Sequence, residues 1–145
     1  MEAIIVAIVV VACLVLYAGR RVRREGPPIL MPEALTVVTF DERTITVRYS
    51  GGETRAIGWD ELTMVGIRTT DEGPFVADVF WELHGPDGGP RVVYPQGATR
   101  EDELLAEMQR RLTGFDDRQL IEAMGSTSNA FFVIWQREDG RLVAA

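Results

Sequence analysis

Residues 77–84 read ADVFWELH, the clearest alternation of apolar and polar side chains in the sequence. Successive side chains of a β-strand point to opposite faces of its sheet, so this pattern predicts a strand with one face in a core. The apolar face carries Ala77, Val79, Trp81 and Leu83, and the other face carries Asp78, Phe80, Glu82 and His84. Trp81 is therefore predicted to be a core residue, whereas Glu82 and His84 are predicted to be solvated.

Further strands are predicted on both sides of this segment. Runs rich in β-branched and aromatic residues place them at residues 37–40, 45–49, 54–57, 63–70 and 91–94. Turn-forming residues separate these runs at 41–43, 50–52 and 85–90. The sequence Trp-Asp-Glu-Leu at residues 59–62 is expected to form a short helical turn. Because the runs follow one another as hairpins, the sheet is predicted to be antiparallel.

Two helices are predicted after these strands. Thr99 and Asp102 resemble a capping box at the start of the first helix, which runs from Arg100 to a stop signal at Gly114. Its apolar stripe consists of Leu104, Leu105, Met108 and Leu112. The spacing of this stripe predicts that the helix covers one face of the sheet.

The second helix is predicted to begin at Asp116, with support from Gln119, and to end at Gly125. Its inward side chains are predicted to be Leu120, Ile121 and Met124. A last strand, rich in aromatic residues, is expected at residues 130–136, and the tail that follows is expected to fray.

These elements predict an α+β domain at residues 35–137, followed by a tail at 138–145. Hairpins followed by helices are typical of an α+β fold with an antiparallel sheet. The preferred architecture is a half-rolled sheet covered by the helix that starts at Arg100. About 110 residues are enough for one core without a disulfide or a metal ion.

A membrane anchor is predicted at residues 3–19, which read AIIVAIVVVACLVLYAG and carry no charge. As a helix, these 17 residues would span roughly 25 Å, slightly less than a hydrocarbon core. The segment from 20 to 34 is basic at its start and rich in proline at its end. Its arginines are Arg20, Arg21, Arg23 and Arg24. By the positive-inside rule these residues predict an outside amino terminus and a cytoplasmic domain.

Three other interpretations of the apolar segment are a secretory signal peptide, a lipoprotein and a buried helix of a soluble protein. A secretory signal peptide has positive charge before its apolar run, whereas only Glu2 precedes this one. Residues 10–13 resemble a lipoprotein cleavage site ending at Cys13, but four more apolar residues follow that cysteine. A single-pass helix in a bacterial inner membrane is therefore preferred. The absence of lysine among 15 basic residues is explained by a high-GC bacterial genome.

The domain is strongly acidic. The chain from Gly26 onward contains 11 arginines and 20 aspartates and glutamates, which gives a net charge of −9. Such a surface is repelled by phosphate backbones, so nucleic-acid binding is not expected. A basic protein partner, or solubility alone, is compatible with this charge.

The stretch from Trp59 to Leu83 resembles small bacterial domains with a pleckstrin-homology-like (PH-like) roll, in which a similar turn precedes a strand, a loop and a strand. The chain also resembles short bacterial proteins of unassigned function, through TTDEGPF at 69–75, DVFW at 78–81, GFD at 114–116 and AMGST at 123–127. This resemblance implies a PH-like domain behind an N-terminal membrane anchor. It implies no reaction, cofactor or catalytic residue, and the strand after the helices is an addition to the roll.

Chemical motifs are weak throughout the sequence. His84 and Cys13 are the only histidine and cysteine, so no zinc site is predicted. Asp71, Glu72 and Asp78 do not have the spacing of a calcium-binding EF-hand loop. The serines at 126 and 128 lack a nucleophile elbow, and His84 would serve them as a base only if the fold brought it to their turn. The glycines of 85–90 have no accompanying lysine, as a phosphate-binding loop would. No cofactor or metal is predicted.

The loop at residues 69–75 is the preferred candidate for a partner-binding surface. Its candidate contact residues are Asp71, Glu72 and Phe75, and Phe80 joins them from the next strand. For Phe75 itself, the preferred interpretation is that its ring closes the open end of the sheet. Phe80 is either an exposed contact residue or a residue that a second layer covers.

Three functions remain open from the sequence. The leading hypothesis is a non-enzymatic, membrane-tethered interaction module, because tethering makes even weak contacts effective. The alternative is an inhibitor or immunity protein that binds a basic protein target. The third is a small-substrate enzyme that uses an acid pair such as Asp78 and Glu82.

Overall fold

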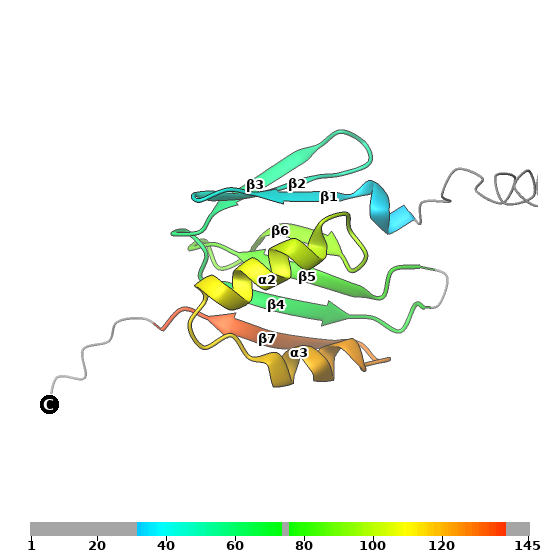
Figure 1. Cartoon of the computed structure of the whole chain (residues 1–145). Coiled ribbons are helices and arrows are strands. Elements are labelled where there is room, and N and C mark those ends of the chain that lie inside the picture. Colours follow the sequence, from blue (N-terminus) through cyan, green and yellow to red (C-terminus); the bar gives the residue numbers. More distant parts are fainter. Residues whose placement is uncertain (1–31, 74–75, 139–145) are drawn as a thin grey trace, which may run out of the picture. The chain divides into compact units, whose positions relative to one another are not determined.

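Antiparallel strands form two sheets in the computed structural model, which describes residues 32–73 and 76–138 (Figure 1). The first sheet has the order β1-β2-β3 and contains β1 (Val37–Phe40), β2 (Thr44–Arg48) and β3 (Thr54–Gly58). The second has the order β6-β5-β4-β7 and contains β4 (Met64–Thr69), β5 (Val79–His84), β6 (Pro90–Pro95) and β7 (Ala130–Gln136). A 3-10 turn, η1 (Pro32–Leu35), precedes β1. The helices within the described residues are α2 (Glu101–Arg111) and α3 (Asp117–Met124). The predicted α+β class with antiparallel pairing is confirmed.

Several predictions lie outside the described residues. They are the anchor at 3–19, the four arginines that follow it, Phe75, and the end of the tail. Within 32–73 and 76–138, no helix has the length and the hydrophobicity that crossing a bilayer requires.

The core lies among α2, the three-stranded sheet and one face of the four-stranded sheet, which α2 crosses in Figure 1. The three-stranded sheet contributes the buried side chains of Val38, Ile45, Val47 and Ile57. Trp81 is fully buried there and stacks on Tyr94, with ring centroids 6.1 Å apart. Leu104 and Met108 of α2 are buried in the same cluster. The predicted apolar face of the strand at 77–84 is therefore confirmed, although the regular strand begins only at Val79. Its first two residues belong to the connection from β4, where the Thr70 N–H donates to the Asp78 carbonyl.

The start of α2 differs from the predicted capping box. The residue before the helix is Arg100, in a left-handed conformation with φ 70°, and no side chain caps the helix there. The hydroxyl of Thr99 instead donates to the carbonyl of Ala34 at 2.7 Å. Backbone hydrogen bonds explain why Thr99 does not cap the helix. The Thr99 carbonyl accepts from the Val38 N–H of β1, and the Thr99 N–H donates to the Thr36 carbonyl just before β1. The threonine is held by the first sheet and is not available to the helix.

The start of α3 agrees with the prediction. The Asp116 carboxylate accepts hydrogen bonds from the backbone N–H groups of Arg118 and Gln119, both at 3.0 Å. The inward orientation of Ile121 was wrong, because this side chain is 74% exposed. The eight-residue helix lies beside β7 (Figure 1), and its contact with the core is limited to Leu120, Ala123 and Met124.

Candidate functional site

The face of the four-stranded sheet that points away from the core carries an unusual set of side chains. We call it the open face and define it by Arg68, Phe80, Glu82, His84, Phe131 and Val133. The strand register sets these side chains in two rows across the sheet. One row is Pro95, Phe80, Arg68 and Phe131, and the next is Val93, Glu82, Gly66 and Val133. Phe131 and Val133 are 38% and 41% exposed, so apolar surface on this face contacts solvent.

A buried carboxylate on β5 links two strands of this face, β5 and β4. Glu82 is only 4% exposed, and its Oε1 accepts a hydrogen bond from Arg68 Nε at 2.6 Å. Its Oε2 lies 3.0 Å from His84 Nε2, and His84 is 8% exposed. The predicted solvation of Glu82 and His84 was therefore wrong. A carboxylate is costly to bury unless it is paired, and here both of its oxygens have a partner.

Phe131 supplies the cover for this cluster. Its ring lies 6.1 Å from the His84 ring in an edge-on arrangement, and the Arg68 guanidinium carbon lies 5.2 Å from its centroid. The ring reaches this position because Gly66 has no side chain, and a Cβ on Gly66 would overlap the ring. Glycine in the interior of a strand lowers stability. Gly66 therefore has a structural consequence: its missing side chain leaves the space on the central strand β4 that the partly exposed Phe131 ring occupies.

Arg68 is held firmly but is about half exposed. Its Nε is bound to Glu82, while its two terminal nitrogens have no hydrogen-bond partner among the described residues. The guanidinium therefore presents a planar edge with free donors, between Phe80 on one side and Phe131 on the other. A rigid guanidinium with two free nitrogens fits the two oxygens of a carboxylate.

The open face continues into a shallow depression beside Phe80. The depression has a volume of about 380 Å³ and is mostly apolar. Phe80, Val93, Tyr94 and Pro95 line it from the four-stranded sheet, and Tyr49, Glu53 and Arg55 line it from the side of the three-stranded sheet. The Tyr49 hydroxyl donates to the Val93 carbonyl at 2.5 Å, which fixes the ring at this edge.

The predicted contact residues separate into two places. Phe80 is half-buried on the open face, beside Arg68 and Pro95. Asp71 and Glu72 are exposed in the β4–β5 loop, and no hydrogen bond among the described residues joins them to the open face. Sequence reasoning missed Arg68, Phe131 and Val133. Phe131 and Val133 could have been predicted from the run Ala-Phe-Phe-Val in β7. Apolar residues in this run occupy both faces of an edge strand, so one face is expected to carry exposed apolar side chains.

The arrangements considered for catalysis are not assembled in the described residues. Glu82 is engaged by Arg68 and His84, so it is not the free member of an acid pair with Asp78. The serine turn lies against Thr69, whose hydroxyl donates to the Ser128 carbonyl at 2.6 Å, whereas His84 lies on the open face. Across 32–73 and 76–138, no group of three or more His, Cys, Asp or Glu side chains could hold a metal ion.

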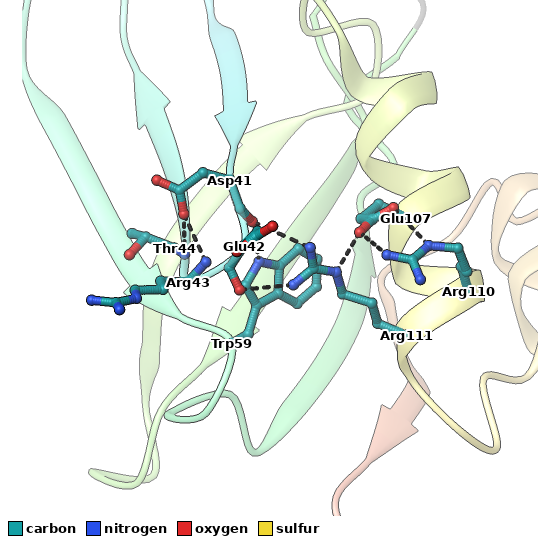
Figure 2. Close-up of polar contacts among 8 residues, drawn as sticks. All are labelled: Asp41, Glu42, Arg43, Thr44, Trp59, Glu107, Arg110 and Arg111. Atoms are coloured by element: carbon teal, nitrogen blue, oxygen red, sulfur yellow. Dashed lines mark hydrogen bonds and ion pairs between the residues drawn. The ribbon is translucent and has the colours of Figure 1, made fainter.

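A second polar cluster joins α2 to the three-stranded sheet (Figure 2). Arg111 lies over the ring of Trp59, 4.6 Å from its centroid, and donates to the Glu42 carbonyl at 2.9 Å. The same guanidinium binds Glu107, which also accepts hydrogen bonds from Arg110. These bonds from Arg110 and Arg111 lower the pKa of the Glu107 carboxyl to about 2. We interpret this cluster as a structural joint, because Arg111 connects α2 to Trp59 and to the Glu42 carbonyl, while the bonds to Glu107 lie within α2.

Comparisons with known proteins complete the description of the site. No protein-family pattern, curated protein or solved structure matches the chain.

Proposed function

We propose that the chain is a non-enzymatic interaction module, held at a bacterial inner membrane by a helix at residues 3–19, with its domain on the cytoplasmic side. The apolar run and the four arginines after it support the anchor and its orientation. The open face supports the binding role. Tethering concentrates this face near membrane-bound partners, so a contact that is weak in solution becomes effective.

The arrangement around Arg68 is the observation that carries the binding role. A glycine in a central strand and a buried carboxylate both oppose stability, yet both hold an exposed Arg–Phe pair in one geometry. Features that oppose stability are expected at functional sites. Arginine and aromatic side chains are also the groups that contribute most to binding at protein interfaces.

We further propose a PH-like roll as the architecture of the domain. Its support is the contact between β3 of one sheet and β6 of the other, together with the apolar core under α2. A sheet that continues from β1 through β3 to β6 and on to β7 would be half-rolled around that core. The resemblance of Trp59 to Leu83 to small bacterial PH-like domains is consistent with this arrangement.

An inhibitor or immunity protein against a basic target is the second candidate. The net charge of −9 after residue 25 favours it, because an acidic surface attracts a basic protein at long range. This hypothesis predicts a toxin gene beside the gene for this chain, and a complex whose association slows steeply as salt is added.

Site-directed crosslinking tests the interaction module. A photoreactive phenylalanine at Val133 of the full chain, expressed in its own membrane, is expected to give a discrete crosslinked product. The same group at Ile121 is the matched control, since that apolar side chain is also exposed but lies on α3. Gly66→Ala should abolish the Val133 product by displacing the Phe131 ring, whereas Gly51→Ala, which has open space around it, should not. Equal products from Val133 and Ile121, or a Val133 product that survives Gly66→Ala, would refute the proposal.

The orientation of the anchor is tested separately. Replacing Arg20, Arg21, Arg23 and Arg24 with uncharged residues is expected to scramble the topology, because these residues are the main charge asymmetry beside the apolar segment. A reporter fused after Ala145 should be entirely cytoplasmic in the wild type and mixed in the variant. A wild-type reporter that is active outside the membrane would mean that the signal-peptide or lipoprotein interpretation is correct.

A further inference from the structure

We infer that the partner of the open face is an extended peptide segment that presents a carboxylate to Arg68, with apolar side chains two residues before and two residues after it. This inference rests on the proposed function and names the partner's chemistry. It begins from the free edge of the Arg68 guanidinium, whose two terminal nitrogens have no partner among the described residues. A carboxylate is the group that such an edge binds through two parallel hydrogen bonds.

The buried Glu82 does not block a second carboxylate. Its oxygens already accept from Arg68 Nε and contact His84 Nε2, and the side chain is shielded from the surface. Glu82 instead acts as a positioning residue, because it binds the guanidinium through Nε and leaves the terminal nitrogens without a hydrogen-bond partner among the described residues. A side chain held in this way loses little conformational freedom when a ligand binds.

The apolar surfaces on either side of Arg68 set the spacing of the segment. Neighbouring strands lie about 4.8 Å apart, so the part of the depression between Phe80 on β5 and Pro95 on β6 lies roughly 5–10 Å from the β4 strand that carries Arg68. Phe131 and Val133 stand on the other side, on β7. In an extended peptide, side chains on one face repeat about every 7 Å. An apolar residue in the depression at Phe80 therefore puts the carboxylate, two residues later, at Arg68.

The acidic charge of the domain would by itself favour a basic peptide over the acidic peptide proposed here. The domain carries a net charge of −9 after residue 25, so an acidic peptide is repelled at long range and a basic peptide is attracted. Any preference for a carboxylate must then come from local contact with Arg68. Such a preference cannot be produced by the net charge.

Three blocked peptides test the inference on the full chain in detergent micelles. They are acetyl-Val-Thr-Glu-Thr-Val-amide and its versions with Gln or Lys at the centre. The Glu peptide is expected to bind about tenfold more tightly than the Gln peptide, the difference that one charge-assisted contact provides, and the Lys peptide should bind most weakly. Binding would be followed by the NMR signal of the Arg68 Nε–H and by titration calorimetry.

Variants of Arg68 distinguish recognition of the carboxylate by a planar guanidinium from recognition by positive charge alone. Arg68→Lys keeps the charge but lacks the forked edge, so its preference for the Glu peptide should fall well below tenfold. Arg68→Gln removes the charge as well, so the Glu and Gln peptides should bind it equally. Arg118→Gln, which removes an exposed arginine on α3, should leave the preference intact. Equal affinity of the Glu and Gln peptides for the wild type, tightest binding of the Lys peptide, or no binding of any of them would overturn the inference. A Val133 crosslink that depends on Gly66 would still support the proposed function in those cases, so the two failures are distinguishable.

Discussion

Replacing Trp81 by Ala is expected to lower the free energy of unfolding by about 3–5 kcal/mol, the usual range for a large aromatic side chain removed from a core. The indole is fully buried, stacks on Tyr94 and is surrounded by the apolar residues of β4, β5 and α2. Its Nε1 also donates to Glu101 Oε1 at 2.6 Å. Urea denaturation followed by circular dichroism would measure the change.

The hydrogen bond to Glu101 suggests the control. Burial raises the pKa of the Glu101 carboxyl, and the bonds from Gly97 and Trp81 oppose this shift. Trp81→Phe keeps an aromatic ring in the core but removes the indole donor, so it should destabilise the domain by less than Trp81→Ala does. A melting temperature of Trp81→Ala within a degree or two of the wild type would mean that the core assignment of this strand is wrong.

Trp81 also illustrates what the sequence could predict. Alternation with a period of two is a local property of the chain, so residues 77–84 alone identify which side chains enter the core. The cap at Asp116 is local as well, because its partners are the N–H groups of Arg118 and Gln119. Both predictions agree with the structure for that reason.

The open face could not be predicted in the same way. Glu82 is buried by Arg68, 14 residues earlier, and its neighbour His84 is covered by Phe131, far later in the sequence. Only the register of β5 with β4, and of β4 with β7, brings these residues together. A polar residue on the polar face of a strand is solvated by default. No local pattern in the sequence predicts that the Phe131 ring packs against the backbone of Gly66.

The errors at the helices have the same origin. Thr99 has the residue type and spacing of a cap, but the edge of β1 binds its backbone and the Ala34 carbonyl takes its hydroxyl. Ile121 follows the helical period only approximately, and α3 contacts too narrow a strip of the sheet to bury it. In both cases tertiary contacts override a local signal.

Replacing Arg111 by Ala is expected to destabilise the domain by about 2 kcal/mol. Arg111 is the arginine of the joint in Figure 2 that connects α2 to the three-stranded sheet. About 1 kcal/mol is expected from the cation–π contact with Trp59 and a similar amount from the hydrogen bond to the Glu42 carbonyl. Its side chain is only 24% exposed, so solvent compensates little for the loss.

Arg110 provides the matched control, because it binds the same carboxylate from the next position of α2. Its side chain is 67% exposed and its only partner in the described residues is Glu107. An exposed ion pair of this kind contributes little, so Arg110→Ala should unfold at nearly the wild-type urea concentration. Arg111→Lys should fall between wild type and Arg111→Ala, since it keeps the charge but not the planar contact with Trp59. Equal destabilisation by Arg110→Ala and Arg111→Ala would mean that the ion pairs with Glu107 inside α2, and not the contact of Arg111 with Trp59, account for the loss.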